Sequence, residues 1–154
     1  MGKELSKLLQ LPFIDLDDII EEQEGMKISE IFSSKGEAYF RSAESAVLRK
    51  QSETEEFVMA TGGGTPCFHE NMNFLNKKGT SIFLDTPIHE IVRRLDNDQR
   101  KSRPLLAGVS DDQLIHKLEE MLQNRRAFYQ QAHFTVREPK ATAHDVLQLI
   151  SAKK

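Results

Sequence analysis

The sequence FVMATGGG at residues 57–64 is a short apolar run that leads directly into three consecutive glycines. An apolar run of this length, containing an aromatic and a β-branched residue, is typical of a strand buried on both faces. Each glycine costs conformational entropy on folding, and side-chain packing does not require three in a row. A backbone without side chains can, however, approach a ligand closely. We therefore predict a buried strand that ends at a ligand-binding loop; a plain flexible turn is the alternative.

Three further apolar runs resemble strands, at residues 12–15, 80–84 and 133–136. Short strands that alternate with longer helices indicate βαβ crossovers and a mostly parallel sheet covered on both faces. The sequence thus predicts an α/β fold, a three-layer sandwich forming a single domain over residues 1–154. Helices are expected at residues 2–10, 17–24 and 28–35, from residue 37, and around two apolar sets, Leu114, Leu118, Met121 and Leu122, and Val146, Leu149 and Ile150.

The composition is that of an ordinary globular protein, with 38% hydrophobic and 29% charged residues. A formal net charge of −3 gives no bulk attraction to nucleic acid or to an anionic membrane. The apolar runs are too short for a spanning helix or a signal sequence, and the single Cys67 cannot form an internal disulfide. We therefore expect a cytoplasmic protein with no nucleic-acid or membrane partner. A monomeric state and small-molecule substrates are separate expectations, which rest on the resemblance given below.

Acidic residues follow the first predicted strand, where ligands of open α/β sheets bind. Asp15 and Asp17 would point the same way if the strand continued through them. They could then serve as a ligand for magnesium-bound water and as a hydroxyl-binding carboxylate. The alternative is that Asp17 or Asp18 caps the next helix.

Arginines form a third group of candidates. Arg41 lies three residues before Glu44, so the two can pair on one helix face. Arg125 and Arg126 end the helix before the last strand, and Arg103 follows a charge-dense stretch. Forked guanidinium groups suit bidentate capture of a carboxylate or phosphate, although a single surface arginine is usually only solvated.

Taken in order, five stretches of the chain resemble one family, the shikimate kinases, which are small P-loop kinases of aromatic amino-acid biosynthesis. The stretches are PFIDLD at 12–17, GEAYFR at 36–41 with Glu44, ATGGG at 60–64, RPLLAG at 103–108 and RRAFY at 125–129. The last motif commonly reads R-x-P-L/F-Y in the family. Here Ala127 replaces the proline, which leaves Arg125 as the matching arginine.

The resemblance implies ATP-dependent phosphorylation of the 3-hydroxyl of shikimate, with Mg²⁺ as the metal and ATP as the co-substrate. It also implies the P-loop kinase fold with strand order 2-3-1-4-5, a shikimate-binding region at about residues 15–50 and a lid at about residues 96–110. The gluconate kinases share that fold, but they should lack the paired carboxylate-binding arginines. A gluconate-kinase-like sugar-acid kinase is therefore the alternative enzyme.

The resemblance also assigns a role to each matching residue. By analogy, Asp15 holds magnesium through water, and Asp17 binds shikimate hydroxyls and assists deprotonation of the attacking one. Arg41 and Arg125 grip the substrate carboxylate, with Glu44 orienting them. The remaining implied roles are a backbone cover over the substrate from Gly62, Gly63 and Gly64, a phosphate contact from Arg103 and an adenine-side contact from Arg94.

The chain departs from the family at its beginning. The family starts with a strand and the phosphate-binding motif GxxGxGK[ST], which does not occur in these 154 residues. Residues 1–5 resemble the segment that follows that motif. We therefore expect the central strand to be absent, leaving two strand pairs that face a gap, and we expect low stability and no kinase activity from these residues alone. A non-catalytic substrate-binding remnant is the alternative to an enzyme.

Overall fold

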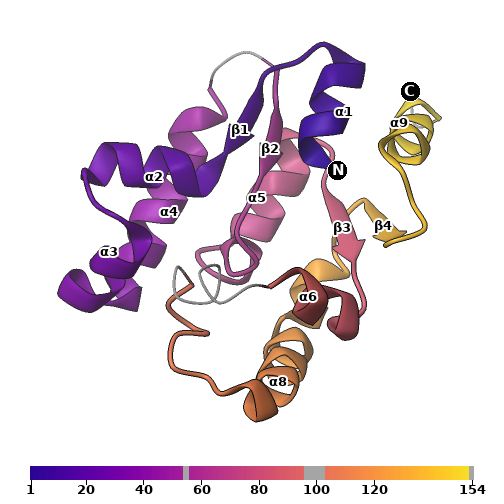
Figure 1. Ribbon diagram of the computed structural model, residues 1–154. Helices are drawn as coiled ribbons and strands as arrows, with labels where there is room; N and C mark the ends of the chain where they lie inside the picture. The colour runs from indigo at the N-terminus through magenta and orange to yellow at the C-terminus, as the bar shows by residue number, and fades with distance from the viewer. Residues whose placement is uncertain (54–55, 96–102, 153–154) are drawn as a thin grey trace.

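The strands of the described residues form two parallel pairs (Figure 1). The computed structural model describes residues 1–53, 56–95 and 103–152, with only the backbone of residue 111. Strand β1 (Phe13–Asp15) pairs with β2 (Val58–Ala60), and β3 (Ile82–Asp85) pairs with β4 (Phe134–Arg137). Within those ranges no strand links the pairs, so the chain has two small sheets in place of one continuous parallel sheet.

Helices connect and cover these strands. In chain order they are α1 (Gly2–Leu9), α2 (Leu16–Glu24), α3 (Ile28–Lys35), α4 (Glu37–Gln51), the 3₁₀ turn η1 (Thr65–Cys67), α5 (Asn71–Lys78), α6 (Ile88–Arg94), α8 (Asp111–Tyr129) and α9 (Ala143–Ser151). The sequence did not predict η1, α5 or α6. The expected strand starts were also early, since β3 begins at Ile82 and β4 at Phe134.

Local signals determine where the helices near the site begin and end. Gly25 ends α2 with φ 66°, and Gly36 lies between α3 and α4 with φ 84°, values that suit glycine. At the start of α3, the Lys27 backbone N–H donates to the carboxylate of Glu30 (2.8 Å), which satisfies an otherwise unpaired donor. As a result, α2, α3 and α4 fold back on one another, and α4 packs against both α2 and α3.

Three apolar clusters among the described residues stabilise the fold. The first lies among α2, α3 and α4 around Leu16 and Leu48, and the third joins α6 to α8 around Leu114. The second cluster joins α1, β4 and α9, and Val58 of β2 and Ile82 of β3 both pack against it. This second cluster therefore links the two strand pairs.

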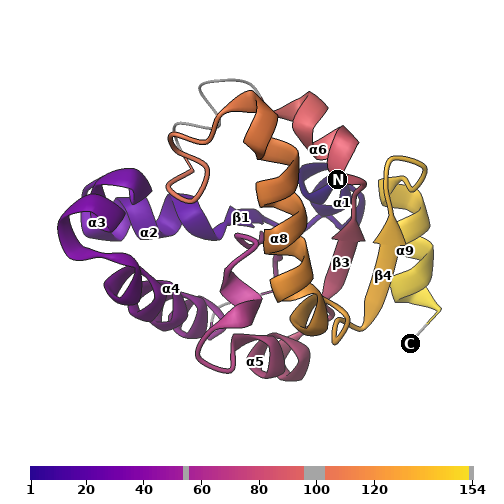
Figure 2. The same cartoon turned by 90° about the horizontal axis from the view of Figure 1, so that it is seen from below.

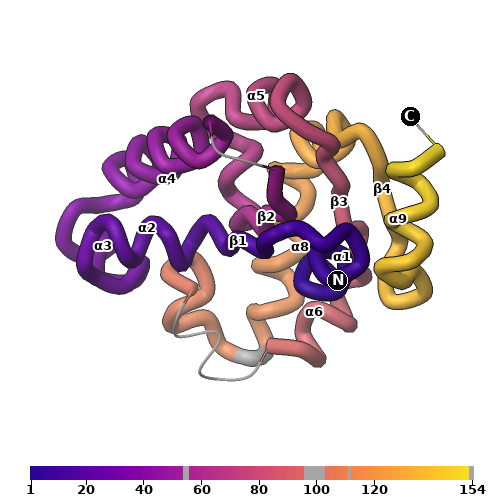
Figure 3. The backbone as a smooth tube through the Cα atoms, turned by 90° about the horizontal axis from the view of Figure 1, so that it is seen from above, coloured from indigo at the N-terminus to yellow at the C-terminus, as the bar shows by residue number. Residues whose placement is uncertain are grey.

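Figures 2 and 3 show how the two strand pairs and their helices are arranged. In Figure 2, α8 lies between the half that contains α2 and α4 and the half that contains β3 and β4. In Figure 3, α1 lies beside α9, and the two helices are in contact. Some apolar side chains of the helices stay partly exposed. Leu149, a member of an expected apolar set, keeps 39% of its surface exposed, and Leu8 of α1 keeps 36%.

Candidate active site

The three glycines after β2 are the point at which the predicted site residues meet. A Cβ atom built on Gly62 would lie 3.5 Å from Asp17 Oδ1 and 3.7 Å from Glu44 Oε1. One built on Gly63 would lie 3.2 Å from Arg125 Nη1, and one on Gly64 only 2.5 Å from Arg41 Nη1. Segments far apart in sequence thus converge on this loop, and the Gly64 position has no room for a side chain.

Arg41 and Glu44 form a buried ion pair on α4, as their spacing predicts. Arg41 Nη1 donates to Glu44 Oε2 (2.9 Å), and the two residues are 5% and 1% exposed. The Nε and Nη2 groups of Arg41 also donate to Glu37 Oε1. The bonds found within the described residues use three of the five N–H donors of a guanidinium, and two remain for a ligand.

Aromatic rings surround the Arg41 guanidinium. Its Cζ atom lies 4.6 Å from the ring centre of Phe68 and 5.0 Å from that of Phe40. A cation over an aromatic face is attracted by the ring quadrupole, and more strongly where water is excluded. The rings and the Glu44 carboxylate together hold Arg41 in one orientation before any ligand arrives.

The acidic pair after β1 differs from the expectation. The strand stops at Asp15, whose Oδ1 accepts a hydrogen bond from the Asp17 backbone N–H (3.1 Å) and so caps α2. Because the helix begins at Leu16, Asp15 and Asp17 are not alternate residues of one strand, and neither Asp17 nor Asp18 is the cap. The helix geometry instead turns Asp17 toward Gly62.

Asp17 is half-buried among other carboxylates. Burial, followed by the charges of Asp15, Glu44 and Glu21, raises its pKa to about 6, while the positive charge of Arg103 works in the opposite direction. An acid with such a pKa is ionised at neutral pH yet basic enough to accept a proton. This carboxylate is therefore suited to general base catalysis.

Arg125 faces the glycine loop from α8, whereas its neighbour Arg126 is exposed. One turn further along α8, the Tyr129 hydroxyl donates to the Gly63 carbonyl oxygen (2.6 Å). Burial raises the pKa of Tyr129, and the charge of Arg125 opposes that shift. The end of α8 thus brings a cation to the loop and fixes the loop backbone.

The predicted lid lies only partly within the described structure, because its residues 96–102 fall outside the described residues. Arg103 is exposed, and its carbonyl oxygen accepts from the backbone N–H groups of Leu106 and Ala107. The buried Leu106 packs on Leu114 of α8. Arg103 therefore sits on a tight turn anchored to α8, close enough to Asp17 to influence its pKa.

Arg94 is not part of this cluster. Its Nε donates to Glu90 (2.9 Å) and its Nη1 to Glu138 (3.0 Å). The carboxylate of Glu138 also accepts from the Thr86 hydroxyl (2.6 Å). These contacts place Arg94 in an ion-pair network at the ends of α6 and β4, and a contact with adenine remains a prediction.

The described residues suit a hydrated magnesium ion better than a bare metal. Across these ranges no group of three or more His, Cys, Asp or Glu side chains is placed to hold a metal. Asp15 uses Oδ1 as the helix cap, which leaves Oδ2 for a water ligand. Because Mg²⁺ keeps several of its waters, one such carboxylate fits an outer-shell contact.

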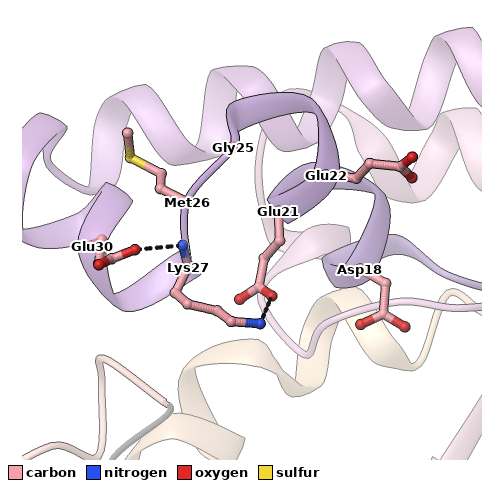
Figure 4. Close-up of a pocket in the computed structure, with 7 residues that line it drawn as sticks. All are labelled: Asp18, Glu21, Glu22, Gly25, Met26, Lys27 and Glu30. Carbon is pink, nitrogen blue, oxygen red and sulfur yellow. Dashed lines mark hydrogen bonds and ion pairs between the residues drawn. The ribbon is translucent and has the colours of Figure 1, made fainter.

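A pocket of about 440 Å³ lies elsewhere, between α2 and α3 (Figure 4). It is lined by Asp18, Glu21, Glu22, Gly25, Met26, Lys27 and Glu30. The ammonium group of Lys27 already pairs with Glu21 (2.7 Å), and the pocket contains none of the predicted site residues. An excess of carboxylates makes it a poor place for an anionic substrate.

Sequence reasoning missed several polar residues that contact the site. Thr65, Asn71 and Tyr129 hydrogen-bond to Glu44, to the Thr65 carbonyl and to Gly63 respectively. Only Tyr129 carried a signal, as the last residue of the motif at 125–129. Cys67 is a half-buried thiol, and burial raises its pKa.

Comparison with known proteins places this arrangement in a family. The family model for shikimate kinase matches residues 1–153. This chain belongs to the shikimate kinase family. A shikimate kinase of Bacteroides fragilis is 42% identical over 134 residues, which cover 87% of this chain and 74% of that protein. One of Parabacteroides distasonis is 39% identical over 153 residues, covering 99% and 88%.

Solved shikimate kinases share the fold. The structure described as shikimate kinase from Acinetobacter baumannii in complex with shikimate superposes with a TM-score of 0.90 and 35% identity, covering 99% of this chain and 86% of that one. The enzyme of Bacteroides thetaiotaomicron gives a TM-score of 0.85 at 35% identity, covering 99% and 88%. The α/β fold with parallel strands is thus confirmed as that of P-loop kinases.

Family membership makes this protein a phosphotransferase, as its motifs predicted. Relatives align with as much as 99% of this chain, and the chain spans 74–88% of their length; these matches give no support to the expectation of no kinase activity. In the part of the chain that the structure describes, no helix is both long enough and apolar enough to cross a membrane.

Proposed function

We propose that this shikimate kinase transfers the γ-phosphate of ATP to the 3-hydroxyl of shikimate. The observation that carries the proposal is the convergence of a base, Asp17, and two cations, Arg41 and Arg125, on residues 62–64. A carboxylate-bearing alcohol fits between such groups, with its acid on the arginines and its hydroxyls on the aspartate. The relative from Acinetobacter baumannii described in complex with shikimate supports this choice of substrate.

The proposed reaction uses positioning and charge, with little covalent work for the protein. Arg41 and Arg125 hold the substrate carboxylate, and backbone groups of residues 62–64 limit its movement. Asp17 accepts the proton of the attacking hydroxyl, and Arg103 supplies positive charge close enough to Asp17 to influence it. Asp15 would hold Mg²⁺ through a water ligand, and the ion would supply positive charge against the phosphate groups.

Several finer features that the family resemblance implies are also proposals. We propose that the two strand pairs correspond to strands 2-3 and 4-5 of the family order 2-3-1-4-5, with helices on either side as in a three-layer sandwich. We also propose the lid role of residues 96–110, the adenine-side role of Arg94, a monomeric state and a cytoplasmic location.

A coupled assay of ADP release tests the reaction, with shikimate and magnesium-ATP as substrates and gluconate as the competing acceptor. Calorimetry with shikimate and with gluconate tests acceptor binding separately. Shikimate should bind more tightly, because its carboxylate can engage both arginines. Tighter binding of gluconate would contradict the proposal.

Substitution of Arg125 by alanine should weaken shikimate binding. Losing one charge-assisted hydrogen bond costs about 1.5–3 kcal/mol, or roughly 10–100-fold in the dissociation constant. Arg126→Ala is the matched control, because Arg126 is the next residue of α8 and is exposed. Calorimetry with shikimate measures both variants, and an equal loss in the two would rule out a specific contact from Arg125.

Arg103→Ala should lower kcat more than it weakens shikimate binding, because the phosphate contact belongs mainly to the reacting state. The expected fall in kcat is about 10–100-fold, the value of one charge-assisted bond. Arg103 lowers the pKa of Asp17. Its removal should therefore also shift the acidic limb of the plot of activity against pH to higher pH. Arg103→Lys keeps the charge and should leave that limb in place; a change confined to the KM for shikimate would refute the assignment.

A further inference from the structure

A chain of buried polar groups extends behind the arginine–carboxylate pair. Thr65 and Asn71 are fully buried, at 0% exposure each, and Ser45 beside them is also buried. The Thr65 hydroxyl donates to Glu44 Oε1 (2.6 Å), and Asn71 Nδ2 donates to the Thr65 carbonyl oxygen (2.9 Å). Buried polar groups are costly unless they are paired, so this chain specifies one arrangement of its members.

Glu44 has its two carboxylate oxygens divided between two partners. Oε2 accepts from Arg41 Nη1, and Oε1 accepts from Thr65. A carboxylate held at one oxygen only can rotate about its last side-chain bond, and an arginine bound to it would rotate as well. The Thr65 bond removes that freedom and so fixes the direction in which Arg41 presents its remaining donors.

Thr65 is itself fixed by hydrogen bonds to its backbone N–H and carbonyl groups. Its N–H donates to the Gly62 carbonyl oxygen (3.1 Å), which closes the turn over the glycine loop. Asn71, which binds its carbonyl, is in turn held by donors from Ser45 (2.9 Å) and Arg49 (2.8 Å). The hydroxyl of Thr65 is therefore a rigid point from which Glu44 can be aligned.

We propose that Thr65 is a positioning residue for substrate binding, acting through Glu44 on Arg41. It does not need to touch the substrate. The inference rests on the proposed function, because it takes the ligand of Arg41 to be the shikimate carboxylate. It assigns a role in substrate affinity to a residue that lies outside the five stretches carrying the family resemblance.

Substitution of Thr65 tests the role directly. Thr65→Val preserves shape but removes the donor, and it should raise the shikimate dissociation constant about tenfold, which is equivalent to ~1.4 kcal/mol. Thr65→Ser keeps the hydroxyl and should restore affinity to within about twofold of the unmodified chain. Calorimetry with shikimate on the 154-residue protein measures both, and thermal melts show that each variant is folded.

Ser45→Ala is the matched control. It removes another buried hydrogen bond of the same network but leaves the contact between Thr65 and Glu44 in place. It should lower the melting temperature much as Thr65→Val does, yet change shikimate affinity less than about twofold. Equal losses of affinity from Ser45→Ala and Thr65→Val would overturn the proposal, since packing alone would then explain both.

A double-substitution cycle separates positioning from a structural role. In an Arg41→Lys background the charge beside Glu44 remains, but the fork that needs alignment is gone. Thr65→Val should therefore have no further effect on affinity in that background, whereas a structural defect would weaken binding by the same factor in both. If the unmodified chain failed to bind shikimate, the proposed function would fail first. If it bound and Thr65→Val bound equally well, only this inference would fail.

Discussion

Asp17→Asn should lower kcat by about 10²–10⁴-fold while shikimate still binds, because asparagine can hydrogen-bond to a hydroxyl but cannot accept its proton. Asp17 lies beside the glycine loop and is the acid of the site with a pKa raised to about 6. The coupled assay at saturating shikimate measures kcat, and calorimetry measures binding. Asp18→Asn is the matched control, because Asp18 is adjacent and exposed and should tolerate the change.

The raised pKa also predicts how this variant responds to pH. In the unfolded chain the carboxyl has its ordinary pKa of 3.8, and in the folded protein burial and neighbouring carboxylates raise it to about 6. A raised pKa means that the fold favours the neutral form, so this contribution to stability is present below pH 3.8 and lost as the pH rises through about 6. Asp17→Asn is always neutral, and it should melt at a higher temperature than the unmodified protein at pH 7.

Thermal melts in magnesium-free buffer between pH 4 and 8 check this expectation. The difference in melting temperature between the two proteins should shrink as the pH falls and vanish near the ordinary pKa. In the same series, kcat/KM of the unmodified enzyme should fall below about pH 6, as the base becomes protonated. A stability gain that did not depend on pH would show that Asp17 is not the group responsible.

Much of the fold could be predicted because local signals agree with it. Gly25 and Gly36 stop helices where expected, and the strand before the glycine loop was clear from residues 57–60 alone.

The helices that the sequence did not predict lack such local signals. Helix α5 reads NMNFLNKK, with few apolar residues to mark a face, and it follows Glu70 in a left-handed conformation. Helix α6 has only 7 residues, too few for a periodic pattern.

The beginning of α2 was mispredicted for a physical reason. Asp15 and Asp17 alternate as residues of a strand do, and the pattern does not reveal that Asp15 uses its carboxylate as a cap. Capping starts the helix one residue earlier than expected and rotates Asp17 toward the loop.

The meeting of the site residues could be predicted only in part. The pairing of Arg41 with Glu44 follows from helix geometry, since the residues are three apart. The approach of Arg125 to Gly63 joins residues more than sixty positions apart, and nothing local predicts it. The family resemblance supplied that information. Thr65 could not be found in this way, because its role depends on a single contact across the fold.

Gly64→Ala should weaken shikimate binding and lower stability, because the added methyl group would overlap the Arg41 guanidinium. Its carbon would lie 2.5 Å from Arg41 Nη1 and 2.6 Å from Arg41 Cζ, well inside ordinary contact distance. Arg41 cannot retreat easily, since it is enclosed by Phe40 and Phe68 and bonded to Glu44. Either the guanidinium leaves its buried partner or the loop moves away from Asp17.

Breaking a buried ion pair costs about 3–5 kcal/mol, so the unfolding free energy should fall by an amount approaching this. Shikimate affinity should fall by at least the roughly 10–100-fold expected for one lost charge-assisted bond. Urea unfolding and calorimetry with shikimate measure the two effects. Gly79→Ala is the control, because Gly79 has an extended backbone and no atom within 4 Å of an added Cβ. If both variants behaved alike, the close approach of Arg41 to Gly64 would have no functional consequence. Binding of the substrate carboxylate would then have to be assigned to Arg125 alone.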